Sequence, residues 1–331
     1  METIVSGIRP TGHLHLGNYF GAVRNFVKLQ ETNKCFFFVA DYHSLTTHPE
    51  AENLKEQVKT VIIEFLASGL DHEKSTLYIQ SDLPEVTELY LLLNMFAYKG
   101  ELERTASFKE KARKQPNNIN AGLLTYPVLM ASDILIHKAS KVPVGKDQEQ
   151  HLEMTRNFAK RFNNFYKTNI LPEPQAFNFG SDLIKVPGLD GSGKMGKSEN
   201  NGIYLVDEPE IIRKKIMRAV TDAGPEKNKP MSEGVKNLFT IMELVSDKQK
   251  VEYFKEQYYN LTIRYGDMKK ELAEDLNKFI EPIREKIKEL SSDKKFIDKV
   301  LKIGAEKAKE SARKTIKEVR EVIGFNNTIS L

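Results

Sequence analysis

The 331-residue chain contains no tryptophan and only one cysteine, Cys35. A single cysteine excludes an intramolecular disulfide and any zinc cluster built on cysteine thiolates. Because Cys35 lies in the apolar run 35–40, we expect a buried, reduced thiol. The longest apolar stretch, residues 89–98, is far shorter than the roughly 20 residues of a membrane span. The N-terminus also lacks the pattern of a secretory signal, so the sequence predicts a soluble, cytoplasmic protein without a membrane partner.

Positive charge is in slight excess, with 50 Lys and Arg residues against 46 Asp and Glu residues. Residues 1–203 carry 23 basic and 23 acidic side chains, so the whole excess lies after residue 203. Between Asp293 and Arg320 there are ten basic and five acidic residues. Such a segment is either a solvated helix face or a surface that contacts RNA, and charge alone favours the solvated face.

Short apolar runs alternate with helical patterns in the first half of the chain. The expected strands are 3–6, 35–40, 76–80 and 142–144, and the expected helices are 17–29, 51–67, 86–98 and 123–137. This alternation predicts an α/β fold with a doubly wound, Rossmann-like parallel sheet. Ligands of such sheets collect at the carboxyl ends of the strands.

The second half of the chain has a different pattern. Residues 180–202 are rich in Gly, Pro and Ser and predict a mobile loop, centred on 187–200. After the loop only helical patterns follow. The last helix places one apolar face at Ile297, Leu301, Ala308, Ala312, Ile316, Val319 and Ile323. We therefore expect an α/β domain at 1–203 and an all-helical domain at 204–331, whose last helix could pack back on the first domain.

The segment that follows the first expected strand predicts an anion site. It contains three glycines, at 7, 12 and 17, and Pro10, and a helix begins near His15. Free backbone N–H groups and the positive end of the helix dipole favour a phosphate there. His15 and Asn18 share a face of the first turn and can both donate to phosphate oxygens, while Gly17 lets a flat ring approach. A metal site at His13 and His15 is disfavoured, because no third ligand is nearby.

Residues 191–198 match the P-loop pattern G-x-x-x-x-G-K-[ST]. A P-loop must follow a buried strand and open a helix, whereas turn-forming residues lie on both sides here. A P-loop NTPase remains an alternative. In either case, Lys194 and Lys197 lie on a flexible loop that is suited to closing over a triphosphate.

The helical segment around Pro127 predicts an amino-acid pocket. Pro127 suits a first helical position, and Tyr126, Met130 and Asp133 then share one side of the helix. An aromatic ring, a thioether and one carboxylate describe an apolar slot with a single polar anchor. An exposed Asp133, or one paired with a lysine, explains the pattern equally well.

These segments together resemble a known family. Residues 15–18 (His-Leu-Gly-Asn) and 194–198 (Lys-Met-Gly-Lys-Ser) are similar to the two signatures of class I aminoacyl-tRNA synthetases. Residues 145–151 (Gly-Lys-Asp-Gln-Glu-Gln-His) resemble the motif of bacterial-type tryptophanyl-tRNA synthetases. The similarity covers essentially the full chain. It implies that the chain activates L-tryptophan with ATP, forming tryptophanyl-adenylate and pyrophosphate, and then transfers tryptophan to tRNA(Trp).

The resemblance also implies residue roles. Asp133 would accept the indole N–H, Tyr126 and Gln148 would hold the ammonium, and Met130, His43, Val142 and Val144 would line the slot. The nucleotide would contact Arg9, Pro10, Thr11, Gly17, Asn18, Gly145, Lys146, Asp147, Val186, Lys194, Met195, Gly196, Lys197 and Ser198. The catalytic groups would be Lys194, Lys197, His15, Asn18 and Lys111, although Lys111 also fits a solvated helix position.

The implied cofactor is ATP with Mg²⁺ as the substrate complex, without zinc or any other protein-bound metal. The implied partners are tRNA(Trp), whose anticodon arm the helical domain would hold, and a second copy of the chain, with the apolar helix 86–98 in the dimer interface. Gly196 replaces the more common Ser of the second signature, and no charge is lost. The alternatives are a tyrosyl-type synthetase and a catalytically inactive, synthetase-like RNA-binding protein.

Overall fold

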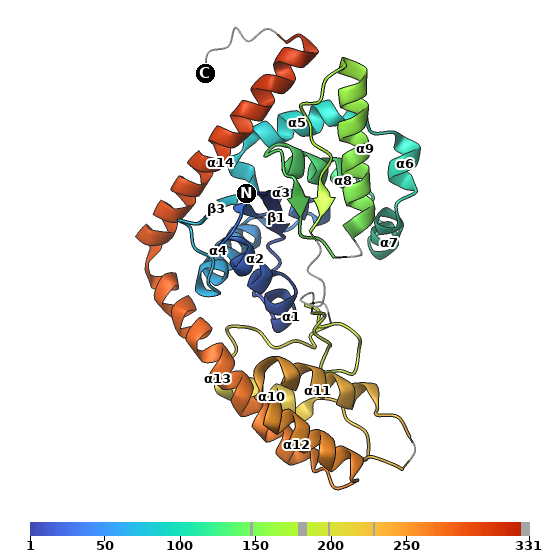
Figure 1. The fold of residues 1–331 in the computed structure, drawn as a ribbon, viewed down its shortest axis with the longest axis vertical. Helices are drawn as coiled ribbons and strands as arrows, with labels where there is room; N and C mark the ends of the chain where they lie inside the picture. The colour runs from blue at the N-terminus through green and yellow to red at the C-terminus, as the bar shows by residue number, and fades with distance from the viewer. Residues whose placement is uncertain (146–147, 178–183, 198, 228, 326–331) are drawn as a thin grey trace.

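The computed structural model describes residues 1–145, 148–177, 184–197, 199–227 and 229–325 (Figure 1). The strands are β1 (Thr3–Ile8), β2 (Lys34–Val39), β3 (Ser75–Ile79), β4 (Lys141–Val142) and β5 (Gln175–Ala176). The first helices are α1 (Leu16–Asn18), α2 (Arg24–Leu29), α3 (Asp41–Ser44), α4 (Ala51–Ala67), α5 (Pro84–Asn94), α6 (Lys99–Glu103), α7 (Ala106–Lys114), α8 (Ala121–Leu135) and α9 (Glu149–Tyr166). The later helices are α10 (Pro209–Arg218), α11 (Glu233–Val245), α12 (Lys248–Tyr259), α13 (Tyr265–Ser292) and α14 (Lys294–Ile323). Three short turns are η1 (Tyr19–Val23, π-helical), η2 (Leu45–Thr47) and η3 (Gln80–Asp82).

The five strands form one parallel sheet in the order β3-β2-β1-β4-β5. Alternate residues of β2 enter two different cores. Cys35, Phe37 and Val39 pack with α2 and α4, whereas Phe36 and Phe38 pack with α5, α8 and α14. A strand that is apolar on both faces requires cover on both faces, which is typical of a doubly wound sheet. The predicted α/β class is confirmed.

Most predicted bounds differ from the structure by a few residues, the helix expected over 86–98 ends at Asn94, and three further differences have a clear physical cause. The fourth strand ends at Val142, because Pro143 has no N–H to donate to a neighbouring strand. The helix expected over 17–29 is interrupted by the π-helical turn η1, which buries Phe20 and Val23. Pro127 does not occupy a first helical position: α8 begins six residues earlier, where the Asn120 side chain accepts a hydrogen bond from the Leu123 N–H at 2.9 Å.

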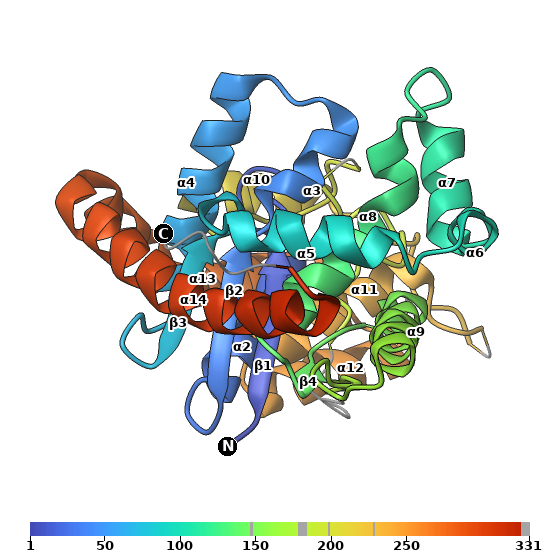
Figure 2. The same ribbon diagram turned by 90° about the horizontal axis from the view of Figure 1, so that it is seen from above.

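Helices α10 to α12 form a lower lobe, and α13 leads from it back toward the sheet (Figure 1). Seen from above, α14 runs beside α5 across the molecule (Figure 2). A Cβ atom on Gly304 would lie 1.7 Å from the carbonyl oxygen of Leu77 in β3, so α14 can approach the strand this closely only at a glycine. Within the described part of the chain, no helix is long and apolar enough to cross a membrane.

Part of the basic excess of α14 pairs with the first domain. Arg313 binds Glu85 at 3.0 Å, and Arg320 binds Glu88 at 2.6 Å through Nε and at 3.0 Å through Nη2. Both carboxylates lie on α5. The predicted apolar face of α14 is buried at Ile297, Ala308, Ala312, Ile316 and Val319. The helix is therefore attached to the α/β part by apolar packing on one side and by ion pairs along its margin.

Candidate functional site

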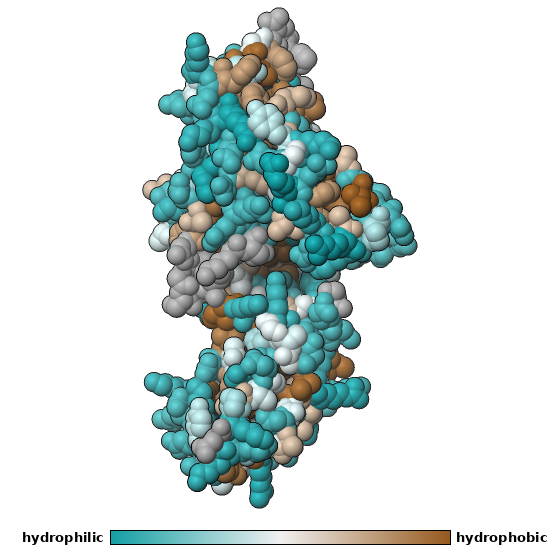
Figure 3. Space-filling view, turned by 90° about the vertical axis from the view of Figure 1, so that its right-hand side faces the viewer, coloured by the Kyte–Doolittle hydropathy of each residue, from teal (hydrophilic) through white to brown (hydrophobic). Residues whose placement is uncertain are grey.

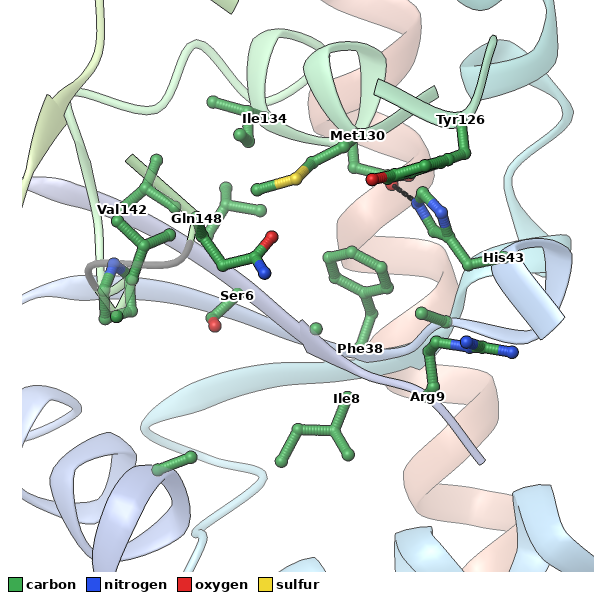
Figure 4. A pocket seen from close by; sticks show the side chains of 18 of the residues that line it. Ser6, Ile8, Arg9, Phe38, His43, Tyr126, Met130, Ile134, Val142 and Gln148 are labelled. Atoms are coloured by element: carbon green, nitrogen blue, oxygen red, sulfur yellow. Dashed lines mark hydrogen bonds and ion pairs between the residues drawn. The ribbon is translucent and has the colours of Figure 1, made fainter. Parts of the chain in front are cut away.

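A cavity of about 470 Å³ lies where β1, β2 and β4 end, at the point where the strand order reverses (Figure 4). All seven residues that the sequence assigned to an amino-acid pocket line it: His43, Tyr126, Met130, Asp133, Val142, Val144 and Gln148. Tyr126, Met130 and Ile134 reach in from α8, while Ser6 and Ile8 of β1, and Arg9 directly after it, lie on the opposite side (Figure 4). The predicted spacing of Tyr126, Met130 and Asp133 does bring these three side chains to one face.

Asp133 is the buried polar anchor of the cavity, with 2% of its surface exposed. Its Oδ2 accepts a hydrogen bond from His43 Nε2 at 2.8 Å (Figure 4). Gln80 Nε2 donates to both carboxylate oxygens, at 2.7 and 2.9 Å. Burial raises the pKa of Asp133, although the donors oppose this shift. Two fixed donors therefore hold the carboxylate in one orientation while a lone pair stays available for a ligand.

Sequence reasoning missed Gln80. This side chain is fully buried and lies directly after β3, at the carboxyl end of the strand. Its position at the end of a predicted strand was the available signal, since ligands of such sheets collect there. The sequence could not reveal that Gln80 binds Asp133, because the two residues are 53 positions apart.

Tyr126 and Gln148 are connected through a buried histidine. His151 approaches the Tyr126 hydroxyl at 2.8 Å with Nε2 and the Gln148 Oε1 at 2.9 Å with Nδ1. The Tyr126 hydroxyl also donates to Ser107 Oγ at 2.6 Å. A single polar network thus joins the two residues that the sequence assigned to the ammonium.

The first signature begins with a capping box. The His15 Nδ1 accepts the Asn18 N–H at 3.2 Å, and the Asn18 Oδ1 accepts the His15 N–H at 3.1 Å. Burial, together with Lys197 and Lys194, lowers the pKa of His15 to about 4, so the ring is neutral at pH 7. Because Nδ1 accepts a hydrogen bond, the proton lies on Nε2, which can donate to a phosphate oxygen.

Glu64, on α4, anchors the segment before this signature. Its Oε2 accepts the Leu14 N–H at 2.6 Å, and its Oε1 lies 2.5 Å from His13 Nδ1. His13 therefore faces a carboxylate on the supporting helix. Among the described residues, no three His, Cys, Asp or Glu side chains are grouped as metal ligands. A Cβ atom on Gly17 would lie 2.8 Å from the His15 ring, so glycine is required for the ring to pack there.

The second signature contacts the turn that precedes the first. Lys197 Nζ donates to the Gly12 carbonyl oxygen at 2.7 Å. The loop is held from below: Asn201 donates to Asp190 Oδ1 at 3.0 Å, and Asn237 of α11 donates to the Gly188 carbonyl oxygen at 3.1 Å. Neither asparagine was singled out from the sequence, because each one acts through partners that sequence spacing does not reveal.

The P-loop alternative is wrong. No strand precedes the glycine-rich segment within residues 184–190, and the described residues 199–202 form turns rather than a helix. Met195 is buried, its N–H donating to the Val186 carbonyl oxygen at 2.9 Å. Val186 is therefore buried beneath the loop and does not line the cavity. Lys146, Asp147 and Ser198 lie outside the described residues.

Basic side chains surround the mouth of the cavity. Arg9 and Lys111 line it, and Lys111 Nζ lies 3.5 Å from the centre of the Tyr126 ring. Burial and the neighbouring Arg9 lower the pKa of Lys111 to about 8. The Nε of Arg9 is buried without a hydrogen-bond partner among the described residues. Lys111 is therefore not a solvated helix lysine, and these cations favour an anionic ligand.

For the ATP-dependent activation that the sequence resemblance implies, we expect kcat/KM for ATP to fall above pH 8. Burial lowers the pKa of Lys197 to about 8, similar to that of Lys111. Both lysines are charged below this pH and lose their charge as the pH rises through it. Between pH 7 and pH 9 the two losses together should lower kcat/KM about 10- to 100-fold, as measured by isotope exchange from pyrophosphate into ATP. Because bound phosphate raises the pKa of a lysine, kcat at saturating ATP should stay nearly constant. A flat kcat/KM up to pH 9.5 would contradict this assignment.

Comparisons with known proteins place the chain among tRNA synthetases. A family model described as tRNA synthetases class I (W and Y) matches residues 2–281. The tryptophan–tRNA ligase of Porphyromonas gingivalis is 61% identical over 326 residues, covering 98% of this chain and 100% of that one. The tryptophan–tRNA ligase of Clostridium tetani is 43% identical, with 98% and 96% covered.

Solved structures agree. Tryptophanyl-tRNA synthetase from Campylobacter jejuni, complexed with ADP and tryptophan, superposes with a TM-score of 0.87 at 35% identity, covering 98% of this chain and 100% of that one. Tyrosyl-tRNA synthetase from Archaeoglobus fulgidus, complexed with L-tyrosine, superposes with a TM-score of 0.66 at 21% identity, covering 86% and 90%. The second likeness concerns the fold alone.

Proposed function

The chain belongs to the class I tRNA synthetases of the tryptophan and tyrosine group, and we propose that L-tryptophan binds in the cavity and reacts there with ATP. The chain is a tryptophan–tRNA ligase: it forms tryptophanyl-adenylate with release of pyrophosphate and then transfers tryptophan to tRNA(Trp). The observation that carries the site assignment is the buried Asp133 at one end of an apolar slot whose mouth is lined by cations. An indole N–H fits this acceptor, and the apolar walls fit the ring.

The first step needs positioning more than proton transfer. The tryptophan carboxylate is ionised at pH 7, so it can attack the α-phosphorus of ATP without a general base. We assign the ammonium to Tyr126 and Gln148, which would aim the carboxylate at the nucleotide. The neutral His15 ring, with Asn18 beside it, is placed to donate to phosphate oxygens. ATP enters as its Mg²⁺ complex.

Three cations are assigned to the charge that develops on the phosphates. Lys194 and Lys197 come from the second signature, and Lys111 comes from α7. Fixed positive groups in a site that excludes water stabilise such charge more than they would in solution. We assign the border of the nucleotide to Arg9, Pro10, Thr11 and Gly145; the same role for Lys146, Asp147 and Ser198 rests on the sequence alone.

The test is amino-acid-dependent exchange of pyrophosphate into ATP. Tryptophan should support exchange, and the other amino acids should not. Exchange with tyrosine would favour a tyrosyl-type enzyme. Absence of exchange with every amino acid, in a preparation that still binds tRNA, would favour a catalytically inactive RNA-binding protein. Transfer to tRNA(Trp) is then measured with labelled tryptophan.

We assign residues 1–203 to the chemistry and residues 204–331 to tRNA, whose anticodon arm we place on the helical part. The acidic partners of Arg313 and Arg320 on α5 neutralise part of the basic excess of α14. The lower lobe is the part of the helical region that lies away from the sheet (Figure 1). We place the reaction in the cytoplasm, where tRNA is charged.

We also propose a homodimer that uses α5 and its surroundings. Leu91 and Met95, one turn apart, are 57% and 69% exposed, and Tyr98 and Phe165 are 64% and 70% exposed. The Phe96 and Phe165 rings lie 5.8 Å apart, which connects the end of α5 to α9. Apolar surface gathers at the upper end of the molecule in the view of Figure 3. An apolar patch of this kind on a mainly hydrophilic surface is typical of an interface.

Replacing both Leu91 and Met95 by Glu should convert the dimer into a monomer, because four buried charges would oppose one another across a two-fold interface. In sedimentation velocity, the unmodified chain should have twice the 37.8 kDa chain mass and the double variant only the chain mass. Tyr259→Glu, on the 73% exposed tyrosine at the end of α12, is the control and should stay dimeric. A monomeric unmodified chain would contradict the proposal.

A further inference from the structure

His151 is a buried titratable residue to which the proposed reaction assigns no role. It lies in the first turn of α9, ends the segment 145–151, and exposes only 2% of its surface. It does not line the cavity. Each of its ring nitrogens nevertheless contacts a residue that lines the cavity: Nδ1 contacts Gln148, and Nε2 contacts Tyr126.

The described contacts form a network around the imidazole. Nδ1 lies 2.9 Å from Gln148 Oε1, and Nε2 lies 2.8 Å from the Tyr126 hydroxyl and 2.8 Å from Ser107 Oγ. The Tyr126 hydroxyl and Ser107 Oγ are themselves 2.6 Å apart. Thus one imidazole connects α7, α8 and the residue that precedes α9.

The chemistry of the partners determines where the protons lie. An amide oxygen cannot donate, so Nδ1 must carry a proton and donate it to Gln148 Oε1. In the neutral ring Nε2 then has a lone pair and must accept from a hydroxyl. Whether Tyr126 donates to Nε2 or to Ser107, its proton points into this network. The remaining lone pairs of the Tyr126 oxygen are then available on the cavity side.

The same argument applies to the amide of Gln148. With its oxygen toward the Nδ1–H of His151, the carboxamide is held in one orientation, because a rotation by 180° would bring its NH₂ group against that donor. A carbonyl oxygen has two lone pairs and can accept a second hydrogen bond. Tyr126 and Gln148 thus each offer an acceptor to a ligand that has only donors, and an ammonium group is such a ligand.

We propose that His151 is a positioning residue for the ammonium of the amino-acid substrate, acting through Tyr126 and Gln148 without touching the substrate. The inference rests on the proposed function, since it assigns the ammonium to these two acceptors. It predicts a loss of substrate binding that is confined to molecules with an ammonium group. A residue that only supports the local fold would weaken the binding of every ligand of the slot.

The experiment compares unmodified protein with His151→Phe, which keeps a ring but removes both hydrogen bonds. In tryptophan-dependent pyrophosphate exchange, KM for tryptophan should rise about 10- to 100-fold, the range of a lost hydrogen bond to a charged group. KM for ATP and kcat should change less than about threefold. Two inhibitors separate the roles: tryptamine has the ammonium, and indole-3-propionate lacks it. The inhibition constant should rise with KM for tryptamine and stay unchanged for indole-3-propionate.

Two further variants separate the contributions of the hydrogen bonds to Gln148 and to Tyr126. The amide of His151→Asn falls near the Nδ1 position and keeps the donor to Gln148, whereas the amide of His151→Gln falls near Nε2 and keeps an acceptor for Tyr126. Each should recover part of the tryptamine affinity lost in His151→Phe. These variants also test the inference if the Phe variant does not fold.

His137→Phe is the matched control. His137 is also a buried histidine between a tyrosine and a serine, with Tyr78 at 3.0 Å and Ser311 at 3.1 Å, but it lies outside the cavity lining. It should leave the ratio of the two inhibition constants unchanged. Equal changes for both inhibitors in the His151 variants, or no change for either, would overturn the inference. Failure of the unmodified protein to exchange with tryptophan would instead overturn the proposed function.

Discussion

Replacing Asp133 by Ala should raise KM for tryptophan at least about 100-fold and remove most of the preference for tryptophan over phenylalanine. The carboxylate is buried and would lose a charge-assisted hydrogen bond to the indole, which contributes about 1.5–3 kcal/mol. Removal of the carboxylate also leaves the donors of His43 and Gln80 without their acceptor in an apolar site, and a buried unpaired donor costs additional free energy. KM values from pyrophosphate exchange with each amino acid measure the effect.

Selectivity should change because tryptophan binds more weakly, not because another amino acid binds much more tightly. A site built around a buried acceptor rejects ligands without the matching donor, because the acceptor is left unpaired. In Asp133→Ala this penalty disappears, so phenylalanine should bind no worse than before. Asp82→Asn is the control: Asp82 lies in the same region, in η3, but does not line the cavity, and its substitution should leave both KM values unchanged. Unaltered tryptophan preference in Asp133→Ala would contradict the assignment.

Acidification should have the same effect as the substitution. Because burial raises the pKa of Asp133, the carboxylate becomes protonated at a higher pH than an exposed aspartate. A protonated carboxyl loses its charge and donates where it should accept. Tryptophan affinity should therefore decrease as the pH falls toward the raised pKa, whereas the lysines that we assign to ATP stay charged at low pH, so ATP affinity should not decrease.

The sequence predicts best where a pattern is local. Strand β2 was predicted because its apolar run is too short for a helix, and the cavity-facing side of α8 was predicted from the spacing of Tyr126, Met130 and Asp133. The two phosphate-handling segments were predicted from a glycine-rich turn before a helix and from two lysines on a glycine-rich loop, and the family resemblance then identified them as signatures. In each case the residues that carry the prediction are within about ten positions of one another.

What the sequence could not predict depends on contacts between distant segments. Glu64 is, in the sequence, one more polar residue on an amphipathic helix, yet it accepts a backbone hydrogen bond from Leu14, directly before the first signature. Asn237 lies 49 residues from the carbonyl that it binds, and Gln80 lies 53 residues from Asp133. For α14 the apolar stripe was visible, but its docking on β3 depends on the fit between Gly304 and the Leu77 backbone. The apolar periodicity of a helix predicts that one of its faces is buried, but it does not identify the element that packs against that face.

Replacing Lys197 by Ala should lower kcat of adenylate formation about 10²- to 10³-fold while KM for tryptophan changes less than about threefold. The ammonium lies 2.7 Å from the Gly12 carbonyl oxygen, so it connects the second signature to the turn that presents the first. It is half-buried, where an unscreened positive charge acts strongly on phosphate oxygens. Lys194→Ala should lower kcat less, because Lys194 is exposed, so that solvent screens its charge more than that of the half-buried Lys197. Single-turnover formation of tryptophanyl-adenylate at saturating ATP measures the chemical step directly.

The ratio of kcat to KM effects shows what the lysines do. An interaction that forms only as charge develops on the phosphates lowers kcat and leaves tryptophan binding intact, whereas uniform binding raises KM alone. Lys114→Ala is a suitable control, since Lys114 is exposed and paired with Glu110 at 2.7 Å on α7. It should retain kcat within about twofold. If Lys197→Ala instead raises KM for ATP with kcat unchanged, Lys197 holds the nucleotide equally in the ground state and the transition state. In that case the catalytic charge must come from Lys111 and Lys194, and the same measurement on their Ala variants would locate it.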